Sequence, residues 1–301
     1  MKKIILLIAA ACMACTAAFA QTVKPFKEGE RAVFLGNSIT DGGHYHSYIW
    51  LYYMTRFPDM PIRVFNGGIG GDTAYDMNKR LDGDIFAMKP SVLMVTFGMN
   101  DSGYFEYNGD KPKEFGEQKY QESIKNYQQM EKRFKDLPDT RIVMVGTSPY
   151  DETVQLKENT PFKTKNETIK RLVEYQKESA AKNNWEFTDL NAPMVALNQQ
   201  YQQKDPTFTL CGSDRIHPDN DGHMVMAYLF LKAQGFAGKE VADIRIDAAK
   251  GEVLESANCK ISNLRKYGRD LSFDYLANSL PYPMDTVAHG WGMKRGQANA
   301  A

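Results

Sequence analysis

The chain has 301 residues, and its 37 basic and 37 acidic side chains give a formal net charge of zero at pH 7. This balance, with no Lys/Arg-rich run, argues against nucleic acid as a partner, because binding to a phosphate backbone depends on clustered positive charge. The length is enough for one large α/β domain and a small additional part.

The first twenty residues are predicted to be a secretory signal peptide that is not part of the fold. Two lysines precede an apolar stretch too short to span a bilayer, and residues 18–20 fit a small-x-small cleavage site. We therefore expect export to the periplasm or the extracellular space. Cys12 and Cys15 raise a lipid-anchored alternative, but neither follows a convincing lipobox. No other apolar run is long enough to predict a transmembrane segment.

Residues 21–238 alternate between strand-like apolar runs and helix-length periodic stretches. We predict strands at 31–36, 62–66, 92–97, 141–147 and 185–189. We predict helices near 45–57, 73–88, 117–136, 164–183, 191–203 and 221–235, with Asp221 as the cap of the last one. Strands that alternate with helices indicate a parallel sheet covered on both faces, with functional side chains at the carboxyl ends of the strands.

The pattern changes in residues 239–301, which we separate as a small β-rich C-terminal extension. Apolar and polar residues alternate at 241–247 and again at 271–275, which predicts short antiparallel strands. This segment could be the start of a longer accessory region. The exported chain would retain Cys211 and Cys259, and an oxidising compartment permits a disulfide between them. Sequence alone gives no distance between the two, so we favour separate thiols.

Three side chains in the larger segment can supply a nucleophile, a base and an orienting carboxylate. Ser38 follows a predicted buried strand, and Gly36 allows a sharp turn at the end of that strand. Asp214 and His217 lie three residues apart in the run DRIHP. A serine hydroxyl attacks an ester only if an imidazole accepts its proton, and a carboxylate must fix the tautomer of that imidazole. The chain order Ser, Asp, His therefore predicts a catalytic triad.

Two further strands end in glycine-containing turns, NGGIGGDT at 66–73 and GMND at 98–101. Such turns present backbone N–H groups and an amide side chain to a developing oxyanion. The first turn does not satisfy the G-x-G-x-x-G pattern of a nucleotide site. Asp101 is interpreted as a residue that braces the second turn. His44 and His46 have a spacing that could hold a metal, but no carboxylate or cysteine cluster accompanies them.

The blocks GNSIT, NGGIGGDT, GMND and DRIHP, in this order, resemble those of the SGNH hydrolases, also called GDSL esterases. The resemblance covers roughly residues 30 to 235. It implies a flavodoxin-like three-layer α/β/α sandwich with a mostly parallel five-stranded sheet. It also implies that no metal or organic cofactor is needed.

Carried over by matching motifs, Ser38 is the nucleophile, His217 the base and Asp214 its orienting partner. The oxyanion donors implied by the resemblance are the N–H groups of Ser38 and Gly71 and the side chain of Asn100. One departure is visible, since Asn37 stands where the family has an aspartate. This change puts the hydrogen bonding of the turn in doubt more than the activity.

Aromatic side chains are dense directly after the GMND block. Tyr104, Phe105 and Tyr107 lie in a stretch punctuated by glycine and proline, which is typical of a loop and not of a core element. We predict that these three side chains are exposed and stack on a substrate.

The sequence therefore predicts an exported serine esterase that hydrolyses short acyl esters, above all acetyl esters, of a glycan or another small acylated molecule. No long apolar lid that would cover a lipid tail is apparent. A lipase, lysophospholipase or thioesterase of the same family is the first alternative. A glycan-binding protein that has kept the fold without turnover is the second.

Overall fold

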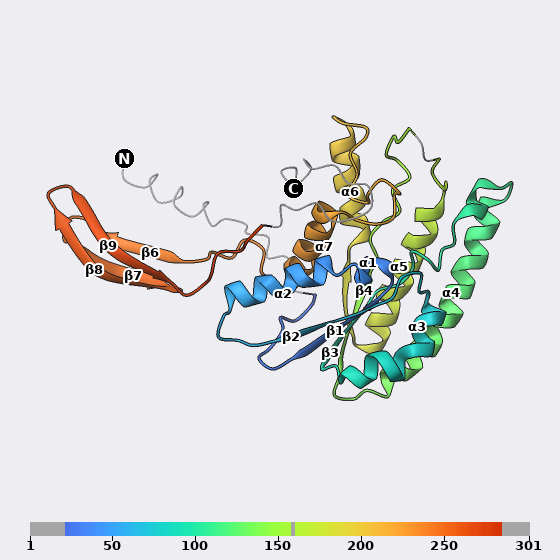
Figure 1. The fold of residues 1–301 in the computed structure, drawn as a ribbon, viewed down its shortest axis with the longest axis horizontal. Helices are drawn as coiled ribbons and strands as arrows, with labels where there is room; N and C mark the ends of the chain where they lie inside the picture. Colours follow the sequence, from blue (N-terminus) through green and yellow to red (C-terminus); the bar gives the residue numbers. More distant parts are fainter. Residues whose placement is uncertain (1–21, 158–159, 285–301) are drawn as a thin grey trace, which may run out of the picture.

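The computed structural model describes residues 22–157 and 160–284. The predicted signal peptide, residues 1–20, and the polar C-terminal end therefore lie outside the described residues. Within them, a five-stranded sheet forms the centre of the molecule (Figure 1). Its strands are β1 (Arg31–Gly36), β2 (Arg63–Gly68), β3 (Val92–Val95), β4 (Arg141–Gly146) and β5 (Glu186–Asp189).

All neighbouring strands of this sheet are parallel, in the order β2-β1-β3-β4-β5. The strand order reverses between β1 and β3, which are neighbours in the sheet. The chain segments that follow these two strands therefore leave the carboxyl ends in opposite directions. Open α/β sheets bind their ligands at such a point. The predicted α/β class with a parallel five-stranded sheet is confirmed.

Within residues 22–157 and 160–284, seven α-helices connect and cover these strands. They are α1 (Ser38–Asp41), α2 (His44–Arg56), α3 (Ala74–Arg80), α4 (Pro112–Lys135), α5 (Lys165–Asn183), α6 (Asn191–Gln202) and α7 (Asn220–Ala233). In Figure 1, α2 and α7 lie on one side of the sheet, and α3 and α4 lie on the other. The arrangement is the predicted three-layer sandwich.

Two hydrophobic clusters fill the spaces between the layers, because successive strand residues point to opposite faces. Phe34 and Met94 pack with residues of α2, α6 and α7 in one cluster. Val33 and Leu93, one residue earlier in each strand, pack with residues of α3 and α4 in the other. Burial on both faces explains why these strands are continuously apolar.

The main differences from the predicted helices are the end of α3, the start of α4 and the capping residue of α7. The helix expected at 73–88 is α-helical only to Arg80 and continues as one π-helical and one 3-10 turn. Helix α4 begins five residues earlier than expected, because Pro112 occupies its first turn, where the missing N–H costs nothing. Asp219, and not Asp221, caps α7 by accepting a hydrogen bond from Gly222 N at 3.1 Å.

The C-terminal part forms two antiparallel hairpins that extend away from the sandwich (Figure 1). One pairs β6 (Asp243–Asp247) with β7 (Glu252–Ala257), and the other pairs β8 (Cys259–Tyr267) with β9 (Asp270–Ala277). The strands β6 and β9 correspond to the two predicted strands. The strands β7 and β8 were missed, since most of their side chains are exposed and no buried face imposes an alternating pattern.

The chain returns to the sandwich after β9, where Leu280 N donates to Thr55 O at 2.7 Å. Both described cysteines are free thiols, as favoured from the sequence. Cys211 Sγ donates to Pro149 O in the sandwich, and Cys259 lies at the start of β8. None of the helices in the described part of the chain is long and apolar enough to cross a membrane.

Candidate active site

Ser38 is held at the carboxyl end of β1 by the turn that starts α1. A Cβ atom on Gly36 would lie 2.0 Å from Thr40 Oγ1, so only glycine allows the chain to fold back this tightly. Asn37 Oδ1 caps α1 by accepting a hydrogen bond from Ile39 N at 3.1 Å. An amide oxygen therefore caps α1, and the turn around Asn37 has its side-chain hydrogen bond.

The structure brings His217, 179 residues away along the chain, into contact with Ser38, and Asp214 lies on the far side of the His217 ring. Ser38 Oγ lies 2.8 Å from His217 Nε2, and His217 Nδ1 donates to Asp214 Oδ2 at 2.5 Å. The other carboxylate oxygen of Asp214 accepts from the N–H groups of Ile216 and His217, both at 2.9 Å. This is the order of contacts that a nucleophile, a base and an orienting group require.

The environment of Asp214 keeps its carboxylate ionised. Burial by itself would raise the pKa of Asp214, but hydrogen bonds from the His217 ring and from two backbone N–H groups outweigh it and lower this pKa. An ionised carboxylate at this position is able to stabilise an imidazolium at His217.

The predicted oxyanion donors line the same cavity as Ser38 and His217, which has a volume of about 600 Å³. Gly71 has a φ of 85°, in the left-handed region that favours glycine. One N–H of the Asn100 amide donates to Asp72 O at 2.9 Å, and Asn100 Oδ1 accepts from the hydroxyl of Tyr104. An amide nitrogen has two N–H donors, so the second is left for a substrate oxygen.

Asp101 braces the turn that carries Asn100, as predicted from the sequence. Its Oδ1 accepts from Ala74 N and Ser123 Oγ at 2.9 Å, and its Oδ2 accepts from Gly98 N at 3.0 Å. The carboxylate thus connects this turn to α3 and α4, and Asp101 has a structural role beside the site.

Lys165 is a second anchor of this turn, and no sequence motif indicated it. Its side chain is fully buried at the start of α5. Lys165 Nζ donates to Met99 O at 2.7 Å, to Ser102 Oγ at 2.6 Å and to Gly103 O at 2.5 Å. All three N–H donors of one ammonium group therefore hold the residues on either side of Asn100.

The charge of Lys165 should make the activity depend on pH. Burial lowers the pKa of Lys165 to about 7, against the attraction of the Asp101 and Glu152 carboxylates. Below this pH the ammonium satisfies all three acceptors. Above it the neutral amine has only two N–H donors, so we expect kcat to decline because the turn that carries Asn100 loses an anchor.

The pH profile of kcat for Lys165→Arg tests this expectation. A guanidinium stays protonated over the whole range, so the alkaline decline should move to higher pH in the variant. Thermal unfolding of the variant serves as the control for folding. The same alkaline decline in both proteins would contradict the role of Lys165.

Arg215 anchors the loop that carries Asp214 and His217. Although it lies in the DRIHP block, its side chain is 1% exposed, and Nη1 donates to Asp151 O at 3.1 Å and to Val154 O at 2.8 Å. Its φ is 68°, a conformation that costs a non-glycine residue roughly 1–2 kcal/mol. The buried guanidinium thus compensates for local strain and ties the triad loop to the segment after β4.

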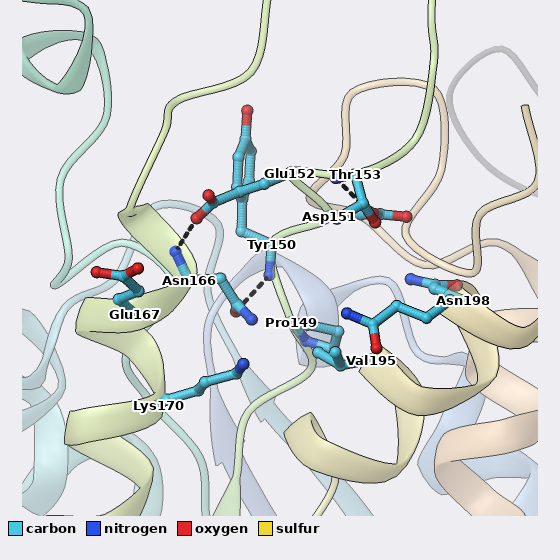
Figure 2. A pocket seen from close by; sticks show the side chains of 11 residues that line it. Pro149, Tyr150, Asp151, Glu152, Thr153, Asn166, Glu167, Lys170, Val195 and Asn198 are labelled. Carbon is cyan, nitrogen blue, oxygen red and sulfur yellow. Dashed lines mark hydrogen bonds between the residues drawn. The ribbon is translucent and has the colours of Figure 1, made fainter. Parts of the chain in front are cut away.

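That segment also forms a separate cavity of about 160 Å³ with the start of α5 and with α6 (Figure 2). Figure 2 shows Glu152 accepting from Asn166 N, while the side chain of Asn166 accepts from Tyr150 N. These contacts hold the loop after β4 against α5. None of the sequence-predicted site residues lines this cavity.

The three aromatic residues after Asn100 have different environments, which corrects the sequence prediction. Phe105 is 79% exposed, and its ring packs edge-on against Phe162. Tyr104 is partly buried and bonds to Asn100. Tyr107 is only 3% exposed and donates a hydrogen bond to Ser102 O, so a substrate cannot stack on it.

The comparison with protein families agrees with this geometry. The model of the GDSL-like lipase/acylhydrolase family matches residues 34–225, which include all four motif blocks. The chain therefore belongs to this family of SGNH hydrolases.

An acetylxylan esterase is similar to this chain in both sequence and structure. The chain is 27% identical over 224 residues to the acetylxylan esterase of Geobacillus stearothermophilus, an alignment that covers 69% of this chain and 95% of that enzyme. A solved structure of this esterase has a TM-score of 0.55 and 25% identity, over 70% of this chain and 96% of the other.

A solved gut microbial diltiazem-metabolizing enzyme is much more similar, with 78% identity and a TM-score of 0.90. The match covers 93% of this chain. It covers 63% of the solved chain, so this sequence spans less than two thirds of that relative's length.

Proposed function

We propose that this protein is an exported serine esterase that removes acetyl groups through an acyl-enzyme intermediate. The observation that carries the proposal is the continuous set of contacts from Ser38 Oγ through the His217 ring to the Asp214 carboxylate, at 2.8 Å and 2.5 Å, in a cavity that also holds Gly71 and Asn100. Export rests on the sequence of residues 1–20 alone.

In the proposed reaction, His217 Nε2 accepts the Ser38 proton while Ser38 Oγ attacks the ester carbonyl carbon. The N–H groups of Ser38 and Gly71 and the Asn100 amide stabilise the oxyanion that forms. Collapse of this intermediate breaks the bond to the alcohol, which leaves with the proton from His217. Water, activated by His217, then attacks the acetyl-Ser38 ester and releases acetate.

We infer that the substrate is the acetate ester of a carbohydrate or of a similar polar alcohol. The similarity to an acetylxylan esterase supports a carbohydrate. The similarity to a diltiazem-metabolizing enzyme supports a small molecule as a second kind of substrate. The acetyl group itself rests on the similarity to the acetylxylan esterase.

A series of aryl esters with acetyl, butyryl and octanoyl groups tests the acyl preference. We expect kcat/KM to be highest for acetate. A clear preference for the octanoyl ester would instead support the lipase alternative, and the absence of turnover would support the glycan-binding alternative.

Phe105 allows a separate test of the carbohydrate. If its exposed ring stacks on a sugar, Phe105→Ala should lower kcat/KM for an acetylated xylo-oligosaccharide by about 5- to 10-fold while sparing a small aryl acetate, because truncated substrates do not use remote contacts. Tyr228→Ala, which removes an exposed aromatic ring from α7, is the matched control. Equal losses on both substrates would contradict a role of Phe105 in sugar binding.

A further inference from the structure

A carboxylate lies beside the nucleophile without any role in the triad. Asp41 is the last residue of α1, three positions after Ser38, and it lines the same cavity. The point that a Cβ atom on Gly70 would occupy is 3.7 Å from Asp41 Oδ2 and 3.9 Å from Ser38 Cβ. The carboxylate and the nucleophile therefore flank the same part of the cavity wall.

The main-chain N–H and C=O groups of Asp41 form hydrogen bonds within the fold, while its side chain forms none in the described residues. Asp41 N donates to Asn37 O at 2.8 Å, and Asp41 O accepts from Asn66 Nδ2 at 3.0 Å. Across the described residues, no hydrogen bond or ion pair engages the Asp41 carboxylate, which is exposed to the cavity. The conformation of α1 thus fixes this negative charge in place without neutralising it.

The ionisable side chains that line the cavity besides Asp41 are those of His44, His217 and His223, and burial lowers the pKa of His223. None of the residues that line the described cavity is Lys or Arg. Arg80 lies near the carboxyl ends of β1 and β2, where it donates to the carbonyl oxygens of Gly36 and Gly67. It also forms an ion pair with Asp72 at 2.6 Å. The cavity therefore carries the negative charge of Asp41 in addition to the Asp214 and His217 pair.

We propose that Asp41 is a specificity residue that favours acetate esters whose alcohol part carries an ammonium group and disfavours anionic ones. The proposal rests on the proposed function, because it concerns the substrates of the same site. The attraction acts on the charge of the substrate, which is the same before and during reaction. It therefore contributes uniform binding, which lowers KM and leaves kcat nearly unchanged.

The test compares two acetate esters of the same shape. Acetylcholine carries a trimethylammonium group, and 3,3-dimethylbutyl acetate has a neutral carbon in place of the nitrogen. We expect the wild type to prefer acetylcholine by about 3- to 10-fold in kcat/KM, mostly through KM, since a partly exposed ion pair is weak to moderate. In Asp41→Asn this ratio should fall to about one, with turnover of the neutral ester retained.

Two controls separate a local charge effect from other causes. Asp59→Asn removes an exposed carboxylate that precedes β2, away from the carboxyl ends of the strands, and should keep the wild-type ratio. Raising the salt concentration to about 0.5 M should reduce the preference of the wild type, because exposed charges are screened.

The outcomes are distinguishable. Equal kcat/KM values for the two esters in the wild type, or an unchanged preference in Asp41→Asn, would overturn the role of Asp41 while leaving the esterase function standing. An equal loss of kcat on both esters in Asp41→Asn would overturn it as well, in favour of a structural role. No turnover of either ester by the wild type would overturn the proposed function and this inference with it.

Discussion

Ser38→Ala should reduce ester hydrolysis by about 10⁴-fold or more while the protein remains folded. The loss is this large because the triad acts as a unit, and an alanine at position 38 leaves His217 without a nucleophile to activate. The fold should tolerate the change, since the Ser38 hydroxyl contacts His217 while the turn around it is held by Gly36 and Asn37. The measurement is kcat/KM on an aryl acetate.

Ser47→Ala is the matched control for this variant. Ser47 lies nearby on α2, is exposed and donates only to the Gly43 carbonyl oxygen of its own helix start. Its replacement should leave the activity close to that of the wild type. Substantial turnover by a folded Ser38→Ala protein, with the same melting temperature as the wild type, would show that another group attacks the ester.

Asn100→Ala should lower kcat by about 100-fold or more, with a much smaller change in KM. The amide pairs with a negative charge that exists on the substrate oxygen only in the transition state and the intermediate, so its loss affects the chemical step and not ground-state binding. Steady-state kinetics with a small aryl acetate separates the two effects.

Tyr104→Phe is the informative comparison for the Asn100 variant. It removes the hydroxyl that bonds Asn100 Oδ1 but keeps the amide nitrogen and its bond to Asp72 O. We expect a smaller loss of kcat than for Asn100→Ala, because the donor is still present but less firmly oriented. If Asn100→Ala raised KM and left kcat unchanged, Asn100 would be an ordinary substrate contact.

The sequence was sufficient to predict the candidate triad and to locate the sheet because both signals are local. Continuous apolar runs predict buried parallel strands, and glycine at the end of a strand predicts the turn that presents Ser38. The three-residue spacing of Asp214 and His217 places both on one turn, and the structure shows the direct contact between them.

The supporting residues could not be predicted, because their roles depend on contacts between distant segments. Lys165 reaches a turn 62 to 66 residues away, and Arg215 reaches a loop 61 to 64 residues away. In a sequence, a buried Lys or Arg looks the same as an exposed one. Only the folded chain shows that each is surrounded by carbonyl oxygens.

The two aromatic residues Phe105 and Tyr107 show the same limit of prediction from sequence. Phe105 and Tyr107 lie in one 3-10 turn, Phe105–Asn108, yet the first is exposed and the second is buried. Tyr107 is held by Thr168 on α5, whose hydroxyl donates to the Tyr107 hydroxyl at 3.0 Å, and nothing within residues 104–107 encodes the position of that helix.

A serine-reactive fluorophosphonate tests the central claim, that His217 activates Ser38, most directly. Intact mass and peptide mapping of the labelled protein should show one adduct, on the peptide that contains Ser38, with parallel loss of activity. His217→Ala should slow the labelling strongly, because the hydroxyl then lacks its base. An active wild-type enzyme that resists the label, or that carries it on another residue, would contradict the account.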